Sequence, residues 1–173
     1  LNVTSISDVA CNEGHFSMLV NQNCKSVKKI ISIDFDENAI NNFYKIVKQD
    51  QAFKNITMMV NNMLLPSNSH YEVAPDVRYK SDCVIALAVT HHLIFGQKYR
   101  IDVIFSKLAS LSNKYVIVEF MPHGLWAGEG HPKPQLPAYY TEEWYVNSMK
   151  KKFKVLNRYD LEANRICFVC EKI

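Results

Sequence analysis

A short turn of small and polar residues separates two apolar segments, each of which contains an aspartate near its end. The first segment carries Asp8 and leads into the turn at residues 10–14, and the second ends in Asp34, twenty residues after Gly14. Small side chains in such a turn let the backbone approach a ligand, and the helix that follows offers unpaired N–H groups. A carboxylate at the second strand end can accept hydrogen bonds from both hydroxyls of a ribose. The pattern predicts a site for a nucleoside-containing cofactor.

Two alternatives to this interpretation follow from the same residues. A nicotinamide dinucleotide site has the pattern Gly-x-Gly-x-x-Gly, whereas this turn has Ala10 and Asn12 at its other small positions, which disfavours a dinucleotide. Asp34 and Asp36 could also cap the helix predicted from about residue 37, because Asp favours the N-cap and the first helical turn. We expect both roles, with Asp34 on ribose and Asp36 as the cap.

The turn resembles motif I of class I S-adenosylmethionine-dependent methyltransferases, which has the form acidic-x-Gly-x-Gly-x-Gly. Asp8, Ala10, Asn12 and Gly14 fall on its four positions, and two of the glycines are replaced. The resemblance continues in order along nearly the whole chain. Residues 32–36 resemble motif II, residues 56–62 the third strand and adenine-side turn, residues 81–93 motif IV, and residues 114–122 a fifth strand ending in Glu-Phe-x-Pro.

The resemblance implies S-adenosyl-L-methionine as the cofactor. It places the methionine portion over residues 10–14, the ribose on Asp34 and the adenine beside residues 61–63. The cofactor-binding residues implied in this way are Asp8, Ala10, Cys11, Asn12, Gly14, Asp34, Phe35, Asn61, Asn62, Met63, Ala86 and Leu87.

Strand-like and helix-like segments alternate along the chain, which predicts a parallel sheet wound by right-handed crossovers. We expect strands near residues 5–11, 30–34, 56–60, 82–87 and 115–120, and helices near residues 14–22, 37–50 and 100–112. Thr141 has the features of an N-cap, and residues 66–80 have the composition of a loop. Residues 153–159 and 165–171 are expected to form a closing hairpin joined by residues 160–164.

The resemblance implies an α/β fold, the Rossmann-like class I methyltransferase sandwich. Its sheet is mostly parallel and seven-stranded, with an antiparallel C-terminal strand and helices on both faces, and the predicted hairpin agrees with this. We expect residues 1–173 to form a single methyltransferase domain. Because the first strand begins almost at Leu1, the helices that usually precede motif I are missing, and we expect a fragment of a longer protein with other domains.

Composition narrows the functional class. The net charge of +3 is spread over interspersed acids and bases, which disfavours a nucleic-acid partner, and no apolar run reaches the ~20 residues of a membrane span. No signal peptide is visible, and the five cysteines show no disulfide pattern, so a cytoplasmic location is expected. Cys167 and Cys170 have zinc-ligand spacing, but an offset of three in a strand puts them on opposite faces, and no metal site is expected.

The candidate catalytic residues are His91 and His92, which follow the fourth predicted strand at the edge where ligands bind. His92 matches a histidine that is often structural in the family, which favours His91 as a base. Methyl transfer can also proceed by positioning alone. Candidate substrate-binding residues lie at the end of the fifth predicted strand and in the aromatic segment after it: Glu119, His123, Trp126, Tyr139 and Tyr140. Glu119 could instead be a structural hydrogen-bond partner, and the aromatics could extend the core.

We therefore expect methyl transfer from S-adenosyl-L-methionine to an oxygen or nitrogen of a small-molecule, glycan or lipid-linked acceptor. One alternative is a methyltransferase-like domain that serves as a non-catalytic binding module or scaffold, because motif I is substituted. A nicotinamide-dependent Rossmann oxidoreductase is a further alternative, which the missing glycines and the closing hairpin disfavour.

Overall fold

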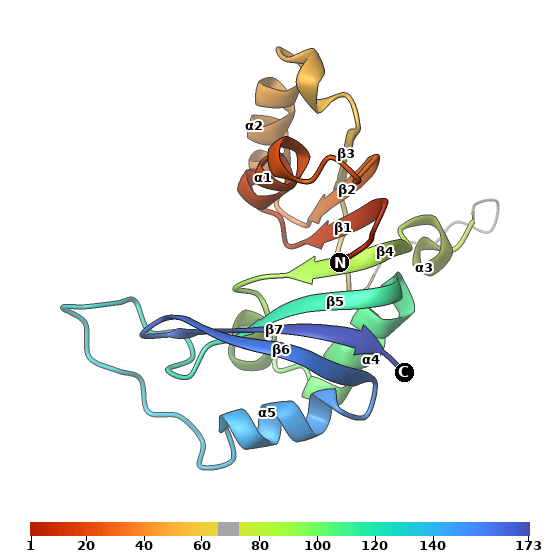
Figure 1. Cartoon of the computed structure of the whole chain (residues 1–173). Coiled ribbons are helices and arrows are strands. Elements are labelled where there is room, and N and C mark those ends of the chain that lie inside the picture. The colour runs from red at the N-terminus through yellow and green to blue at the C-terminus, as the bar shows by residue number, and fades with distance from the viewer. Residues whose placement is uncertain (66–72) are drawn as a thin grey trace. The chain divides into compact units, whose positions relative to one another are not determined.

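The computed structural model describes residues 1–65 and 73–173, and the chain divides into two compact units (Figure 1). The first unit contains residues 1–85 and 110–114, and the second contains residues 86–109 and 115–173. Residues 66–72 of the predicted loop lie outside the described residues.

The first unit is built on parallel strands in the order β3-β2-β1-β4. These strands are β1 (Ser5–Val9), β2 (Lys29–Asp34), β3 (Ile56–Val60) and β4 (Ser81–Ala86). Val9 of β1 pairs with Ile33 of β2, and Asp34 pairs with Val60 of β3. The carboxyl ends of three neighbouring strands therefore meet at one edge, where the sequence placed the cofactor site.

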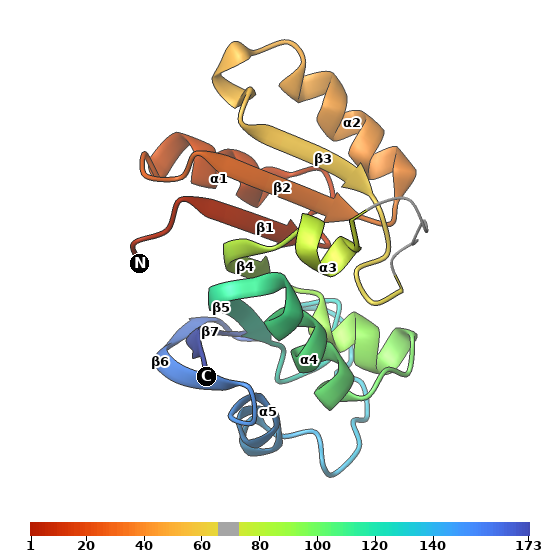
Figure 2. The same cartoon turned by 90° about the vertical axis from the view of Figure 1, so that its right-hand side faces the viewer.

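Helices α1 (His15–Asn23) and α2 (Glu37–Val47) lie against the same face of these strands (Figure 2). Asp36 is the N-cap of α2, because its side chain accepts hydrogen bonds from the backbone of Asn38 and Ala39, as predicted. A 3₁₀ helix, η1 (Gln51–Phe53), follows α2. The prediction of a loop through residue 80 was wrong in part, since Pro75 opens a short helix, α3 (Pro75–Arg78), at a position that suits proline.

The second unit contains antiparallel strands in the order β5-β7-β6. They are β5 (Ser112–Phe120), β6 (Phe153–Glu162) and β7 (Arg165–Lys172), and the helices are the π-helical η2 (His92–Gly96), α4 (Ile101–Leu111) and α5 (Glu142–Met149). The predicted five-residue connection between β6 and β7 was too long. Pairing continues to Glu162 and Arg165, with register shifts, so only residues 163–164 form the turn.

Aromatic packing holds the helices of the second unit on its strands. Tyr145 of α5 is fully buried, with its ring centroid 5.1 Å from that of Phe105 in α4 and 4.9 Å from that of Phe120 in β5. Its hydroxyl donates to the Glu119 carbonyl at 3.0 Å. Thr141 caps α5 by accepting a hydrogen bond from the Trp144 backbone, which confirms that prediction.

The seven strands and their directions confirm the predicted class, a mostly parallel sheet with an antiparallel C-terminal strand. Among the helices of residues 1–65 and 73–173, none has the length and apolar character needed to cross a membrane.

Candidate cofactor and acceptor sites

The turn between β1 and α1 has left-handed backbone at each position where motif I has glycine. The φ angles are 58° at Ala10, 51° at Asn12 and 76° at Gly14. This conformation is favourable for glycine and tolerated by asparagine, whereas it is strained for alanine. The chain therefore keeps the backbone conformation of a glycine-rich turn despite two substitutions, which points to a constraint on the path of the backbone.

Gly14 is also required for close packing of the two helices of the first unit. It is the N-cap of α1, and a Cβ atom added there would lie 2.1 Å from Cζ of Phe43 in α2. Phe43 is fully buried, so its ring cannot move aside without disturbing the core. Only a residue without a side chain therefore fits at the position where α1 begins.

Asp34 connects this turn to the end of β2. Its Oδ2 accepts a hydrogen bond from the Asn12 backbone at 2.7 Å, and its Oδ1 accepts one from the Asp36 backbone at 2.9 Å. The residue is 7% exposed. A carboxylate has about four lone-pair sites, so two remain for the hydroxyls of a ribose.

Asp8 lies beneath the turn in a network of small hydroxyls. The Ser17 hydroxyl donates to Asp8 at 2.7 Å and lies 2.7 Å from the Ser32 hydroxyl. Burial raises the pKa of Asp8 to about 6. Neither Ser17 nor Ser32 was predicted as part of this site. Ser32 did carry a signal, since it lies inside an apolar strand segment and a buried hydroxyl needs a partner.

Phe35 and the residues expected beside adenine, 61–63, have different surroundings. Phe35 is 66% exposed directly after Asp34, and the Asn61 backbone donates to the Asp34 carbonyl at 2.8 Å. Asn62 is engaged in its own turn, because its side-chain oxygen accepts from the Leu64 backbone at 2.9 Å. Met63 is buried. Phe35 thus offers an exposed apolar surface next to Asp34.

The cysteine of the turn has the environment of a core residue. Cys11 is buried, and burial raises the pKa of its thiol well above the ordinary value, which makes it a poor nucleophile. All five cysteines are free. Within residues 1–65 and 73–173, no three His, Cys, Asp or Glu side chains are grouped so that they could hold a metal ion.

Glu119 is held by structural partners in the second unit. It is buried, its Oε2 accepts from the Ala88 backbone at 2.8 Å, and Arg165 donates to the same oxygen at 3.0 Å. Ala88 has a left-handed φ of 48° and follows Ala86, which is buried, and Leu87, which is half-buried. These contacts favour the structural role for Glu119, the alternative that the sequence left open, because a buried carboxylate requires such partners.

The two adjacent histidines are placed differently. His91 is 4% exposed and its Nδ1 has no hydrogen-bond partner among the described residues, whereas His92 is exposed, with the two ring centroids 4.2 Å apart. Burial, together with the neighbouring His92 and Arg165, lowers the pKa of His91 to about 4. His91 is therefore neutral at physiological pH, with one ring nitrogen unpaired.

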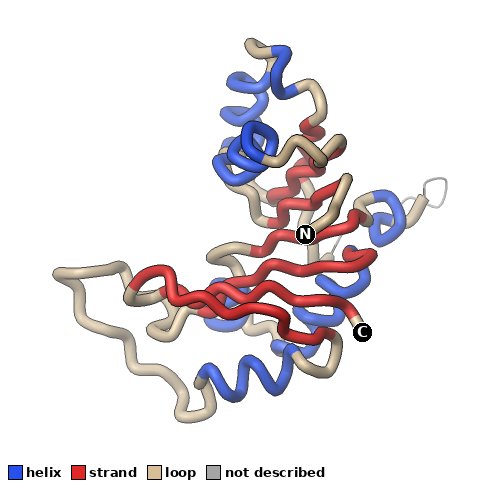
Figure 3. Tube along the Cα trace, viewed as in Figure 1, coloured by secondary structure: helices blue, strands red, loops and turns tan. Residues whose placement is uncertain are grey.

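The segment between β5 and α5 contains no helix or strand (Figure 3). Trp126 is half-buried there, donates to the His131 carbonyl at 2.8 Å and has its ring centroid 5.4 Å from that of His123. Lys133 lies 2.9 Å from Nε2 of His123 and 5.4 Å from the centroid of the Trp126 ring. Desolvation and Lys133 together lower the pKa of His123. The segment therefore has internal contacts of its own.

A cavity of about 430 Å³ lies between this segment and the β6–β7 turn. Trp126 lines it together with Asn164 and Arg165. Tyr140 is not exposed to any such space: it is buried, and its ring centroid is 5.1 Å from that of Phe120. Tyr139 is 54% exposed. The geometry favours Trp126 and Tyr139 as surfaces for a ligand and Tyr140 as part of the core.

No family model matches this chain. The sequence is 25% identical over 172 residues to the nodulation protein NoeA of Rhizobium meliloti (strain 1021), a match that covers 93% of this chain and 34% of that protein. The chain thus spans about a third of the length of this relative.

The fold is similar to several solved structures. The PH0226 protein from Pyrococcus horikoshii OT3 has a TM-score of 0.70 at 14% identity, covering 98% of this chain and 82% of that one. The N-methyltransferase NodS from Bradyrhizobium japonicum WM9 has a TM-score of 0.65 at 12% identity, with 98% and 86% covered. A S-adenosylmethionine-dependent methyltransferase from Aquifex aeolicus has a TM-score of 0.66 at 16% identity, with 98% and 82% covered. The chain therefore shares its fold with these methyltransferases, the fold that its motifs predicted.

Proposed function

We propose that the chain binds S-adenosyl-L-methionine and transfers its methyl group to an oxygen or nitrogen of a small-molecule, glycan or lipid-linked acceptor. The observation that carries this proposal is the left-handed backbone at Ala10, Asn12 and Gly14. Strained backbone conformations are retained where function requires them. Here they shape a turn in which the Asn12 backbone N–H donates to Asp34.

The residues of the first unit fit the parts of the cofactor. The turn at residues 10–14 and the start of α1 would hold the methionine portion, the two remaining lone-pair sites of Asp34 would accept the ribose hydroxyls, and Phe35 would offer its exposed ring to adenine. When bound, S-adenosyl-L-methionine supplies a methyl group attached to a sulfonium, whose sulfur leaves as a neutral thioether and needs no metal.

On the acceptor side we propose two roles. Trp126 would form a wall of the acceptor pocket, because its ring lines the cavity beside the β6–β7 turn. His91 would accept the proton that an oxygen or nitrogen acceptor loses, since it is neutral and its Nδ1 is unpaired. If the acceptor needs no base, positioning alone would suffice.

The name of one matched structure adds support. NodS is an N-methyltransferase, which is compatible with a nitrogen acceptor for this chain. Five free cysteines agree with a reducing compartment such as the cytoplasm. Other domains of a longer protein would supply further contacts, since this chain spans a third of its matched relative.

Calorimetry with S-adenosylhomocysteine tests the cofactor assignment, with NAD as the competing ligand. We expect S-adenosylhomocysteine to bind and NAD not to bind. Transfer of a labelled methyl group from S-adenosyl-L-methionine to fractions of small molecules, glycans and lipids then tests the reaction, with Asp34→Ala as the inactive control. Binding without transfer to any fraction would favour the non-catalytic module, and tight NAD binding would reject the methyltransferase.

A further inference from the structure

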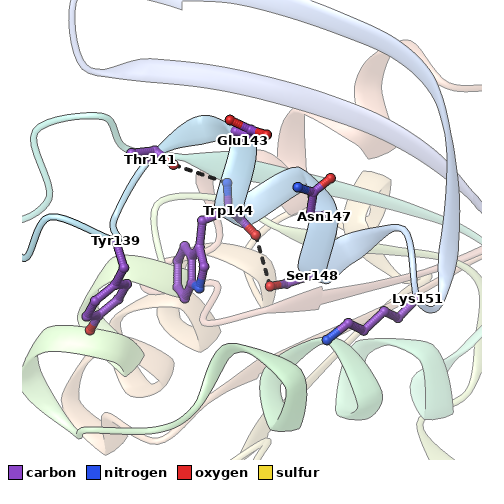
Figure 4. Close-up of a pocket in the computed structure, with 7 residues that line it drawn as sticks. All are labelled: Tyr139, Thr141, Glu143, Trp144, Asn147, Ser148 and Lys151. Atoms are coloured by element: carbon purple, nitrogen blue, oxygen red, sulfur yellow. Dashed lines mark hydrogen bonds between the residues drawn. The ribbon is translucent and has the colours of Figure 1, made fainter.

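Two cavities of the second unit adjoin one pair of aromatic side chains. One, of about 500 Å³, lies along α5, and the other, of about 430 Å³, lies at the start of α4. Tyr139 and Trp144 line both, with ring centroids 5.2 Å apart. Figure 4 shows the two rings side by side, Tyr139 from the segment before α5 and Trp144 from its first turn. The cavities thus form one two-lobed groove with an aromatic divider.

The divider is held in place by the start of α5. The Trp144 backbone donates to the Thr141 hydroxyl at 3.1 Å, and the Ser148 hydroxyl donates to the Trp144 carbonyl at 2.9 Å (Figure 4). The Trp144 ring also lies 5.7 Å from the buried Tyr140 ring, centroid to centroid. A ligand would therefore meet a preorganised surface, which costs little side-chain entropy on binding.

Polar groups around the divider remain available. Glu143 and Asn147 of α5 and Lys151 just after it are spaced four residues apart, and their side chains make no hydrogen bond or ion pair with any described residue. Lys98 in the second lobe is likewise unpaired within the described chain, whereas Arg100 is paired with Asp102 at 2.9 Å. The groove thus combines aromatic faces with unused donors and acceptors.

The charges of the groove nearly cancel. Its lining includes three cationic side chains and two carboxylates, which suits neither a polyanion nor a polycation. Apolar ring faces bordered by unpaired amide, carboxylate and ammonium groups match a ligand with flat C–H faces and many hydroxyls. We infer that this groove binds a neutral oligosaccharide, with one sugar ring in each lobe on either side of the Tyr139–Trp144 pair.

This inference deepens the proposed function and rests on it in one respect: the saccharide would be the part of a glycan acceptor that does not react. Binding energy from such a remote part can position the reacting atom. Saccharide binding itself requires no cofactor, so the two proposals can be tested separately on the same protein.

The chain has only two tryptophans, Trp126 and Trp144, and each indole N–H gives its own signal in a ¹H–¹⁵N spectrum. We would titrate the protein with cellotetraose, laminaritetraose and N-acetylchitotetraose at millimolar concentrations. Sorbitol, which has hydroxyls but no ring, and adenosine, which has a flat ring, serve as controls. We expect at least one tetrasaccharide to shift the Trp144 signal, and neither control to shift it.

Tyr139→Ala should weaken that binding about tenfold, the loss expected for one aromatic contact. The matched control is Tyr44→Ala, because Tyr44 in α2 is 53% exposed and lies in the other unit. The affinity of this control variant for the tetrasaccharide should be unchanged. Asn147→Ala provides a second variant of the groove without loss of core packing, since Asn147 is exposed.

The inference is overturned if no tetrasaccharide shifts Trp144 while S-adenosylhomocysteine still binds, or if sorbitol or adenosine shifts Trp144 as much as the tetrasaccharides do. It is also overturned if only the Trp126 signal moves, because the saccharide then binds elsewhere. A Trp144 shift that Tyr139→Ala weakens supports the groove even if S-adenosylhomocysteine fails to bind, in which case only the methyltransferase proposal fails.

Discussion

The backbone nitrogen of Asn12 lies 2.7 Å from Oδ2 of Asp34 and donates a hydrogen bond to it. This bond joins the turn after β1 to the carboxylate that ends β2, so the two segments proposed to contact the cofactor are directly linked. A hydrogen bond to a carboxylate is also stronger than one between neutral groups, which helps to hold Asn12 in its left-handed conformation.

Asp34→Ala should weaken the binding of S-adenosylhomocysteine by about 1.5–3 kcal/mol, the range for hydrogen bonds to a charged group. Calorimetry measures this. Asp36→Ala is the control: it removes the N-cap of α2 and should cost about 1 kcal/mol of unfolding free energy while leaving affinity unchanged. Equal losses of affinity in both variants would contradict a ribose contact for Asp34.

Gly14→Ala should destabilise the protein by about 2–5 kcal/mol, because the new Cβ meets the Phe43 ring and adopts a left-handed conformation. Gly96→Ala is the matched control, since a Cβ there has no atom within 4 Å and the change should be within about 0.5 kcal/mol. Urea unfolding gives both values. Similar stability of the two variants would show that α1 and α2 can separate at this point.

Asp8 should make the unfolding free energy depend on pH. Its pKa is about 6 in the folded protein against an ordinary value of 3.8, so its contribution is favourable at low pH and is lost as pH rises through about 6. Asp8→Asn mimics the protonated carboxyl, and its unfolding free energy relative to the unmodified protein should rise by about 2 kcal/mol between pH 4 and pH 7. A difference that does not change with pH would contradict the raised pKa.

His91→Asn should lower the rate of methyl transfer about 10²-fold with little change in affinity for S-adenosylhomocysteine, if His91 is the base. The lowered pKa of His91 gives an independent readout. As pH falls from about 6.5 to about 4, His91 takes up a proton in the unfolded chain but stays neutral in the folded protein. As pH falls through this range, the unmodified protein should therefore lose unfolding free energy relative to the His91→Asn variant. His92→Asn, at an exposed position, should leave the rate of methyl transfer unchanged.

Trp126→Ala and Tyr140→Ala should separate the acceptor wall from the core. Tyr140 is buried, and its truncation should cost about 3–5 kcal/mol, whereas Trp126→Ala should leave thermal stability nearly intact and reduce transfer to the labelled acceptor fraction. A large fall in melting temperature for Trp126→Ala, with unchanged turnover of the folded protein, would remove Trp126 from the acceptor site.

Local patterns were enough to identify most elements of the fold. Alternating apolar segments located the strands to within a few residues, and the cap residues Asp36 and Thr141 marked two helix starts, because capping depends on neighbours in sequence. The closing hairpin and its antiparallel direction followed from the same reasoning. The short α3 helix was missed, since four residues carry too little periodicity to distinguish a helix from a loop.

The sequence by itself determined the motif positions, and thereby the residue types at the cofactor edge and the order of the elements that carry them. Only the tertiary structure decided which polar side chains are already paired. Glu119 lies at the end of one predicted strand and His91 follows another. Glu119 has Arg165 and the Ala88 backbone as partners, whereas Nδ1 of His91 has none within the described residues. Arg165 lies 46 positions from Glu119 along the chain. Pairing over such a separation depends on strand register and packing, which no local pattern encodes.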